Sequence, residues 1–310
     1  MQVNDLRAFV LTVELGSVTR AASRLSRVQS AVSQAIGRLQ KEFGVVLLVR
    51  GSSGMEPTPA GLELARQGKV ILGLIERVER DIAAYRDTGV DNGGELAGTV
   101  ELGIATALTP TLLSWLLRAV RARFPRITVR AREDINAEIT TLVSEGRLNL
   151  GVVWLPVRAE GLVSRRLGSS GLVAVLPADH PCSDINPLPL ARLSDDAWIS
   201  FPEGNPLRRW LEQSCAQVGF APNVRYEVHT LSEAKAFVES GVGVTLLTRS
   251  SISLGAVSGK LRVLPLEPPG SANFGYIATA AGRSAVTDAV IALLEEAFGD
   301  RAGASRADLS

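Results

Sequence analysis

The sequence contains few of the residues on which disulfide-stabilised proteins, zinc proteins and many enzymes depend. Its 310 residues include two cysteines, Cys182 and Cys215, and two histidines, His180 and His229. Two cysteines are too few for a disulfide scaffold or a zinc finger, and they favour a reduced, intracellular protein. Two histidines leave few candidates for general acid-base catalysis or for a metal site.

Neither a long apolar run nor a strong net charge is present. The most apolar window, residues 102–117, is shorter than the ~20 residues that span a bilayer, and Pro110 interrupts it. Residues 1–14 carry Asp5, Arg7 and Glu14 and do not form the apolar core of a signal peptide. We therefore predict a cytoplasmic protein with no membrane partner. The 33 basic and 32 acidic residues give a net charge of +1, so binding to nucleic acid would require a local basic patch.

The residues that are present are typical of a folded globular protein. Hydrophobic residues make up 46% of the chain and charged residues 21%, which excludes wholesale disorder. At roughly 150 residues per domain, the length predicts two domains, or one large one.

The first 58 residues show the periodicity of three short helices followed by a hairpin. Gly16 ends the first predicted helix, and Ser17 can cap the second. The apolar run 45–49 and the glycines at 51 and 54 predict a two-stranded wing. Together these features indicate a winged helix-turn-helix unit. The apolar stripes of the three helices comprise Leu6, Phe9, Val10 and Val13, then Ala21, Ala22 and Leu25, then Val32, Ile36 and Leu39.

The third helix has a polar face opposite its apolar stripe. This face comprises Gln29, Ser30, Ser33, Gln34, Gly37, Arg38 and Lys41. An ordinary solvated helix surface is the alternative interpretation. However, Gln pairs with the adenine edge, and Ser, Arg and Lys contact phosphates or bases. Residues 17–50 also supply the local basic patch, with one acidic residue, Glu42, among the basic residues Arg20, Arg24, Arg27, Arg38, Lys41 and Arg50.

Residues 59–90 predict one long helix with a heptad seam. Apolar residues recur every seven positions from Leu64 to Tyr85, with a second series between them, and the outward positions are charged. We predict that a second copy of the chain covers this seam. The predicted dimerisation residues are Leu64, Ile71, Ile75, Val78 and Ile82.

Beyond a linker at residues 91–94, predicted strands alternate with predicted helices. This alternation favours a mostly parallel sheet covered by helices. The predicted strands are 99–105, 127–132, 148–154, 172–176, 198–201, 224–228 and 242–247. The predicted helices are 111–124, 137–146, 207–218, 231–240 and 285–298, and we expect disorder in the polar tail that follows.

The first 65 residues resemble the LysR-type transcriptional regulators. The matching residues are Leu6, Phe9, Val13, Gly16, Ser17, Ala21, Ala22, Leu25, Gln29, Ala31, Val32, Ser33, Ile36, Leu39, Gly44, Leu47, Arg50, Thr58, Ala60 and Gly61. Further matches at 124–125, 146–151, 176–181 and 241–247 extend the resemblance over nearly the whole chain.

The resemblance implies an α/β fold in three parts. These are a winged helix-turn-helix domain at 1–58, a linker helix for dimerisation at 59–90, and a two-lobed effector domain at 95–300 that is similar to periplasmic binding proteins. Lobe I would comprise about 95–157 and 267–298, and lobe II about 158–266.

The resemblance also implies a function and its partners. We expect a homodimer or homotetramer that binds double-stranded promoter DNA, and a small-molecule effector that changes DNA bending and contact with RNA polymerase. No other cofactor, metal or catalytic residue is implied. The DNA-binding residues would be Arg20, Gln29, Ser30, Ser33, Gln34, Arg38, Arg50 and Thr58.

The chain departs from the family pattern at several positions. Val28 stands where a polar helix cap is usual, so we expect Ser26 to cap the third helix instead. Ser30, Gln40 and Leu48 replace a usual proline, glutamate and phenylalanine, and the wing turn at 51–54 has no basic residue. The family's DNA sequence preference therefore cannot be transferred to this chain.

The predicted effector site lies at the ends of strands in the C-terminal half, where ligands of doubly wound sheets bind. Helix capping is the alternative role for each Ser and Thr, and core packing is the alternative for Trp154 and Phe201. Arg208, Arg209 and Arg249 are candidates to pair with a carboxylate ligand. The predicted site residues are Thr106, Ala107, Leu108, Trp154, Ser200, Phe201, Pro202, His229, Thr230 and Thr248.

The sequence also bears on three alternative functions, namely an enzyme, a solute-binding protein and an oxidant sensor. An enzyme is disfavoured, because the sequence has no phosphate-binding loop, no G-x-S-x-G and no H-E-x-x-H. A solute-binding protein would use the two-lobed half without DNA, but we would expect it to have a secretion signal and no DNA-binding part. Some members of the family sense oxidants through a cysteine pair, yet Cys182 and Cys215 are 33 positions apart and nothing near them in sequence favours a thiolate.

Overall fold

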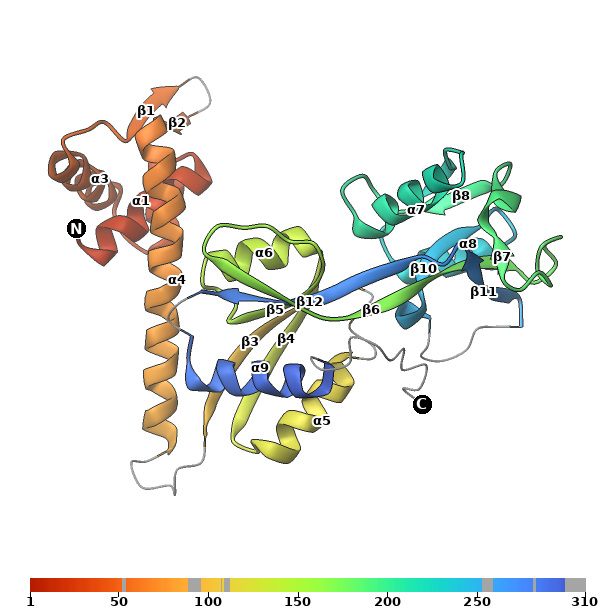
Figure 1. The fold of residues 1–310 in the computed structure, drawn as a ribbon. Coiled ribbons are helices and arrows are strands. Elements are labelled where there is room, and N and C mark those ends of the chain that lie inside the picture. Colours follow the sequence, from red (N-terminus) through yellow and green to blue (C-terminus); the bar gives the residue numbers. More distant parts are fainter. Residues whose placement is uncertain are drawn as a thin grey trace. The chain divides into compact units, whose positions relative to one another are not determined.

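The computed structural model describes residues 1–51, 54–88, 96–106, 108, 112–252, 259–280 and 283–298, with the side chains of 80, 81 and 83–88 excepted. The chain forms two compact units, one of residues 1–92 with the segment 144–147 and one of residues 93–143 and 148–310 (Figure 1). Among the described helices, none is both long and apolar enough to cross a membrane.

The first unit begins with three helices, as the apolar stripes predict. These are α1 (Val3–Leu15), α2 (Val18–Arg24) and α3 (Gln29–Phe43). Leu6, Phe9 and Leu39 are fully buried between them. Gly16 adopts the left-handed conformation that ends α1, and Ser17 Oγ accepts a hydrogen bond from the Arg20 amide at 3.3 Å, which confirms both predicted helix signals.

The predicted cap of α3 is wrong. The helix begins at Gln29, and Val28 in the cap position offers no side-chain acceptor. Ser26 instead lies in a left-handed turn with φ of 53°, and its amide donates to the Ser23 carbonyl at 3.2 Å. The turn therefore uses Ser26 to change the chain direction after α2 and leaves the first turn of α3 without a side-chain cap.

The predicted wing forms from β1 (Leu48–Gly51) and β2 (Gly54–Pro57), which pair in antiparallel fashion. Gln40 Oε1 accepts hydrogen bonds from the Leu47 and Leu48 amides at 2.8 and 3.3 Å, so α3 holds the start of the wing. The Met55 amide donates to the Gly16 carbonyl at 2.9 Å. Position 54 requires glycine, because its φ is 132° and a Cβ there would lie 2.5 Å from the Gly16 carbonyl oxygen.

Helix α4 (Pro59–Thr88) follows the wing and packs its first half against α1. The Thr58 hydroxyl accepts from the Gly61 amide at 3.1 Å and donates to the Val46 carbonyl at 2.8 Å, which caps α4 and joins it to the wing. Gly68 allows the close approach to α1, because a Cβ there would lie 2.8 Å from Val10 and 2.9 Å from Leu6.

The second unit has a mixed sheet in the order β4-β3-β5-β12-β6-β11-β7, with β10 also paired to β6. Strands β3 (Gly98–Ala105), β4 (Ile127–Asp134) and β5 (Leu150–Trp154) are parallel to one another, as predicted. Helices α5 (Ser114–Arg123), α6 (Asn136–Ser144) and α9 (Ala285–Phe298) belong to the same lobe (Figure 1).

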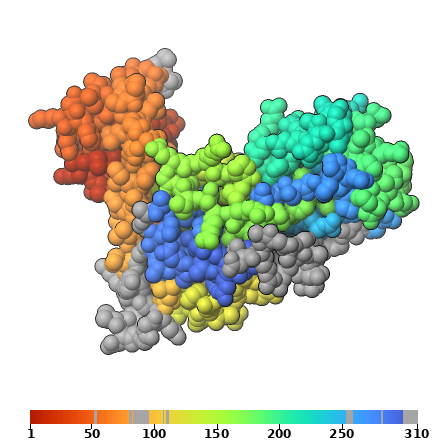
Figure 2. Space-filling view, viewed as in Figure 1, coloured from red at the N-terminus to blue at the C-terminus, as the bar shows by residue number. Residues whose placement is uncertain are grey.

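The prediction of a mostly parallel sheet is wrong. The remaining strands are β6 (Leu162–Pro177), β7 (Leu188–Pro189), β10 (Thr245–Thr248), β11 (Leu261–Glu267) and β12 (Ser271–Thr279). Strand β6 pairs antiparallel with β12 along 162–171 and with β10 and β11 along 172–177. One long strand therefore serves both lobes, and Figure 2 shows atoms of β6 and β12 passing between them.

The second lobe adds the parallel pair β8 (Ala197–Ser200) and β9 (Asn223–Glu227), with helices α7 (Pro206–Gln217) and α8 (Leu231–Glu239). Two short 3-10 helices, at Leu190–Leu193 and Arg249–Ser251, complete it. Trp198 of β8 is fully buried at the centre of this lobe.

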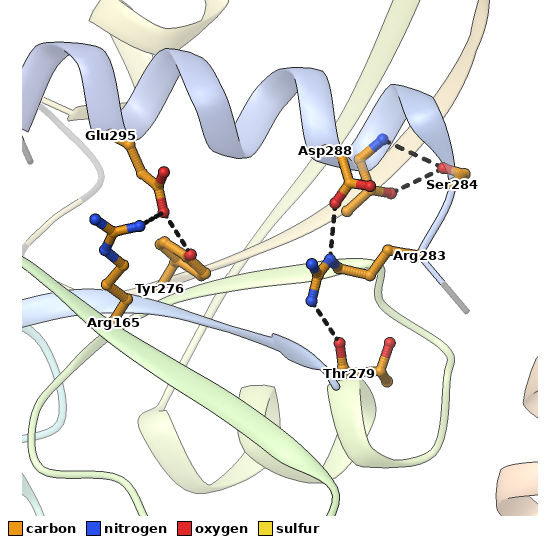
Figure 3. Close-up of polar contacts among 8 residues, drawn as sticks. Arg165, Tyr276, Thr279, Arg283, Ser284, Asp288 and Glu295 are labelled. Carbon is orange, nitrogen blue, oxygen red and sulfur yellow. Dashed lines mark hydrogen bonds and ion pairs between the residues drawn. The ribbon is translucent and has the colours of Figure 1, made fainter. Parts of the chain in front are cut away.

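Polar contacts fasten α9 to the sheet (Figure 3). Glu295 accepts hydrogen bonds from Arg165 Nη1 at 2.7 Å and from the Tyr276 hydroxyl at 2.6 Å. Burial and the nearby Glu295 carboxylate raise the pKa of Tyr276. At the other end, Arg283 donates to Asp288 at 2.7 Å and to the Thr279 carbonyl at 3.0 Å. Helix α9 is thereby joined to β6 and β12, the two strands that connect the lobes.

Candidate nucleic-acid interface and ligand pocket

The predicted polar face of α3 is solvent-exposed. Gln29, Ser30, Ser33 and Gln34 are all exposed, while Val32, Ala35, Ile36 and Leu39 on the opposite face are buried. The helix therefore presents amide and hydroxyl groups along one side without having to unpack its core. Such a face can make the hydrogen bonds that distinguish base pairs in the major groove.

Arg38 lies on this face but is already paired. Its Nε and Nη2 donate to Asp5 Oδ2 and Oδ1 at 3.0 and 2.5 Å, and the Asp5 carboxylate on α1 is buried. The hydrogen bonds from Arg38 lower the pKa of Asp5, and Asp5 in turn raises the pKa of Arg38. Arg38 is therefore not the free cation that the sequence suggests, since it shares its charge with a buried partner. Asp5 was not among the residues predicted for DNA binding.

The remaining residues predicted to contact DNA differ in whether their side chains already make hydrogen bonds within the protein. Arg50 is exposed on β1 of the wing. Arg20 is exposed on α2, but its Nη2 donates to the Leu15 carbonyl. A hollow of about 440 Å³ lies beside it, lined by Leu15, Thr19, Arg20, Ser23 and Arg24. The Thr58 hydroxyl is committed to the cap of α4, which is a structural role rather than that of a free donor.

The heptad seam of α4 divides into two parts. Leu64 and Ile71 pack against the core of their own unit, so they do not form a free seam. Ile75 is half-buried, whereas the side chains of Val78 and Ile82 are 58% and 55% exposed. The side chain of Tyr85 lies outside the described part of the chain. The correction to the prediction is that the exposed part of the heptad seam begins after Ile75.

Three of the predicted effector residues follow β3. Thr106 donates from both its amide and its hydroxyl to the Asp134 carbonyl, at 3.2 and 3.4 Å. Leu108 is buried in the core, and Ala107 lies outside the described residues. The hydroxyl of Thr106 therefore joins β3 to β4 rather than standing free.

Trp154 is buried, and it connects the two lobes. Its Nε1 donates to the Thr106 carbonyl at 3.0 Å, and its ring packs edge-on against Trp210 of α7 and Phe274 of β12, with centroids 5.0 and 6.2 Å apart. Ser200 and Phe201 are also buried. The core-packing alternative thus describes Trp154 and Phe201. Trp210 was missed, because its position in an ordinary amphipathic helix gives no signal.

The other predicted effector residues have internal partners. Thr230 caps α8 in a capping box with Glu233, whose carboxylate accepts from the His229 and Thr230 amides at 2.9 Å. These hydrogen bonds lower the pKa of Glu233. Thr248 is fully buried and its hydroxyl bonds to Ser251 at 3.2 Å. His229 is exposed, and helix capping describes Thr230.

A cavity of about 540 Å³ lies beside Pro202, after the end of β8, along β9 and at the first turn of α7. Its volume suits a small molecule. Arg208 on its wall donates to Glu212 at 2.6 Å, while Arg209 and Arg249 are exposed elsewhere. The pocket carries charges of both signs, and its lining residues are Pro202, Glu203, Arg208, Val224, Arg225 and Glu227.

The two cysteines differ in exposure. Cys215 is fully buried in α7, and burial raises the pKa of its thiol to about 12. Cys182 is half-buried, and its amide donates to His180 Nδ1 at 3.1 Å. Among the described residues, no group of three or more His, Cys, Asp or Glu side chains could hold a metal ion.

A winged helix-turn-helix with an exposed polar face, carried on the same chain as an α/β unit with a ligand-sized pocket, defines the class of DNA-binding regulators that respond to small molecules. The chain belongs to the LysR family. Residues 3–62 match the bacterial regulatory helix-turn-helix protein, lysR family, and residues 93–299 match the LysR substrate binding domain. The protein is thus a DNA-binding transcriptional regulator with an effector-binding domain.

Relatives of known name agree with this assignment. The chain is 29% identical over 254 residues to the transcriptional dual regulator GltC of Bacillus subtilis. The matched residues cover 82% of each chain. It is 28% identical over 268 residues to a probable hydrogen peroxide-inducible genes activator of Mycobacterium leprae, covering 86% of this chain and 84% of that one. The fold matches full-length CbnR in complex with its target DNA, with a TM-score of 0.57 at 20% identity over 96% of this chain and 99% of that one.

Proposed function

We propose that this regulator binds promoter DNA as a homo-oligomer, with the polar face of α3 in the major groove. The observation that carries the proposal is the exposed row Gln29, Ser30, Ser33 and Gln34 on a helix whose other side is buried. Two copies of α3 in a dimer would lie about one helical turn (~34 Å) apart. Because its target is genomic DNA, we place the protein in the cytoplasm and assign it no catalytic function and no resident cofactor.

The test is binding of the full-length protein to duplex DNA. Enrichment from a random duplex library should yield a dyad-symmetric site, and we refer below to this enriched DNA as the selected duplex. Fluorescence anisotropy should then show at least 1,000-fold tighter binding to it than to a scrambled duplex at moderate salt. A solute-binding protein would show no such preference. Contact with RNA polymerase is a further proposal, tested by transcription from a promoter that carries the site.

We propose that the effector occupies the cavity at Pro202 and carries a carboxylate. Arg225 lines this cavity and forms no ion pair within the described part of the chain, while Glu203 and Glu227 would accept hydrogen bonds from donor groups of the same ligand. A small amphoteric molecule, such as an amino acid or an amino-substituted aromatic acid, matches this combination of charges. Movement of the lobes about β6 and β12 would then transmit binding to the DNA-binding unit.

A thermal-shift screen of small carboxylates and amino acids against the full chain tests the pocket. We expect the Arg225→Gln variant to bind the compounds that stabilise the wild type about tenfold more weakly, since a charge-assisted hydrogen bond contributes roughly 1.5–3 kcal/mol. Arg209→Gln on the exposed side of α7 is the matched control and should bind normally. Equal binding by all three proteins would place the ligand elsewhere.

The burial of Cys215 argues against a response to peroxide through that thiol, although several relatives are named as hydrogen peroxide-inducible genes activators. A peroxide-reactive cysteine needs an accessible thiolate. Cys215 is buried, so its thiol is not accessible. Its thiol is also not a thiolate, because burial raises the thiol pKa and keeps the proton on sulfur at neutral pH.

We therefore predict that hydrogen peroxide leaves the affinity for the selected duplex unchanged in the wild type. The Cys182→Ser, Cys215→Ser double variant should behave identically, because neither thiol takes part in DNA binding. Anisotropy before and after peroxide, with catalase-quenched peroxide as the control, measures this. A shift in the wild type that disappears in the double variant would show that a cysteine does sense peroxide.

A further inference from the structure

The contact between Asp5 and Arg38 joins α1 to the predicted recognition helix. Asp5 is 3% exposed, whereas the Arg38 side chain is 53% exposed. Nε and one Nη2 hydrogen of the guanidinium are used by the two carboxylate oxygens, at 3.0 and 2.5 Å. This is the two-bond geometry that fixes both the position and the plane of a guanidinium group.

The other edge of the guanidinium remains available. Arginine has five N–H donors in a planar fork, and the pairing with Asp5 uses two of them. Within the described part of the chain, Nη1 makes no hydrogen bond. The free edge therefore carries two parallel N–H groups, one from each terminal nitrogen, and it points away from the buried carboxylate.

The position of Arg38 places this free edge beside the candidate DNA contacts. Arg38 is four residues after Gln34 on α3, so the two side chains share the exposed face of the helix. Two parallel N–H donors match the N7 and O6 acceptors of guanine in the major groove. They also match two oxygens of a DNA phosphate.

We propose that Asp5 is a positioning residue for DNA recognition, which holds Arg38 so that its free edge binds a pair of acceptors on the DNA. This inference rests on the proposed placement of α3 in the major groove. An unrestrained arginine must lose side-chain entropy when it binds. Asp5 removes that cost by ordering Arg38 in the free protein. It also prevents Arg38 from turning toward other phosphates.

The proposal and a purely electrostatic effect predict opposite signs for Asp5→Asn. Removing a negative charge near DNA should by itself strengthen binding to every duplex. If Asp5 positions Arg38, the selected duplex should instead be bound about tenfold more weakly, while the scrambled duplex is bound equally or more tightly. Anisotropy titrations with the two duplexes measure both affinities. Tighter binding of both duplexes by the same factor would overturn the proposal.

A double-variant cycle separates positioning from a role in folding. Arg38→Gln should lose at least the same factor for the selected duplex, and the double variant Asp5→Asn, Arg38→Gln should lose no more than Arg38→Gln alone. Additive losses would show that Asp5 acts independently of Arg38 and would overturn the proposal. If Asp5→Asn does not fold, Arg38→Lys carries the test, because a lysine keeps the charge but cannot bind Asp5 and DNA through two parallel edges.

Glu14→Gln is the matched control. Glu14 is another carboxylate of α1, and it pairs with Lys69 at 2.9 Å instead of with α3. Its replacement should leave the ratio of the two affinities unchanged. Failure of the recognition face itself would appear separately, as retained binding by a variant that lacks Gln29 and Ser33. A different pair of results would overturn only the present inference. These are loss of binding in the variant that lacks Gln29 and Ser33, and normal discrimination between the two duplexes in Asp5→Asn.

Modified DNA then identifies the acceptor pair. Replacing single guanines of the selected duplex with 7-deazaguanine should weaken wild-type binding at one position and leave Arg38→Gln unaffected if Arg38 reads guanine. If Arg38 binds a phosphate instead, no guanine should show this dependence, and Arg38→Gln should reduce the salt slope of binding by about one. Either result identifies what Asp5 positions Arg38 against.

Discussion

Replacing Gln29 and Ser33 together with alanine should abolish sequence-specific DNA binding. The two side chains are exposed one turn apart on the polar face of α3. A well-formed contact to a base contributes roughly 1–3 kcal/mol of discrimination against the wrong base. The double substitution would remove two such contacts from each subunit of a dimer. We expect affinity for the selected duplex to fall at least about 100-fold, toward the level of the scrambled duplex.

The measurement is fluorescence anisotropy on both duplexes, with thermal unfolding to show that the variant is folded. Because neither side chain contributes to the core, the unfolding temperature should change little. Gln213→Ala with Ser232→Ala is the matched control, since both residues are exposed on helices of the second unit. Retained affinity for the selected duplex in the Gln29, Ser33 variant would remove α3 as the recognition helix.

Local periodicity was sufficient to predict the helices. The apolar stripes of the first unit mark the side chains that are buried there, such as Phe9 and Leu39. Helix α9 has the predicted bounds of 285 and 298, because its apolar residues recur at helical spacing over its whole length. Each of these helices buries one face against neighbouring elements, so its apolar residues recur at helical spacing within a short window of sequence.

The pairing of the long strands could not be predicted in this way. The first half of β6 carries exposed Arg165 and Arg166, so it does not read as a buried strand. Strand β11 contains Pro265, and β12 contains Gly275, two residues that are unfavourable in strands. Their stability comes from antiparallel partners at least 70 positions away, such as the pairings of Thr245 with Val175 and of Ser271 with Gly171. No local pattern encodes such a partner.

The candidate sites were predicted only in part, because partners across the fold determine which side chains remain free. Thr230 proved to be a helix cap, which is the alternative role predicted for it, and Thr58 proved to cap α4 instead of offering a free donor to DNA. Asp5, however, did have a signal. It occupies a position four residues before Phe9, on the buried side of α1. A carboxylate there requires a buried partner, and Arg38 is the exposed-face arginine that supplies it.

The division of the α4 seam predicts two different outcomes for two pairs of aspartate substitutions. Val78→Asp with Ile82→Asp changes side chains that are mainly exposed in the single chain, so the subunit should remain folded. If a second copy covers these residues, the dimer loses four apolar contacts and gains four buried charges. Each apolar side chain contributes roughly 1.5–3 kcal/mol when buried, so the dissociation constant should rise at least about a thousandfold.

Sedimentation equilibrium of the folded variant measures this directly, and affinity for the dyad-symmetric duplex should fall in parallel because each monomer holds only one half-site. Leu64→Asp with Ile71→Asp should instead lower the unfolding temperature of the first unit, since those side chains pack in its own core. Leu62→Asp is the control for an exposed apolar residue of α4 outside the seam, and it should leave the dimer intact. An unchanged dimer in the Val78, Ile82 variant would mean that this stretch of α4 is not where the two copies meet, because four unpaired carboxylates cannot remain buried in a stable apolar interface.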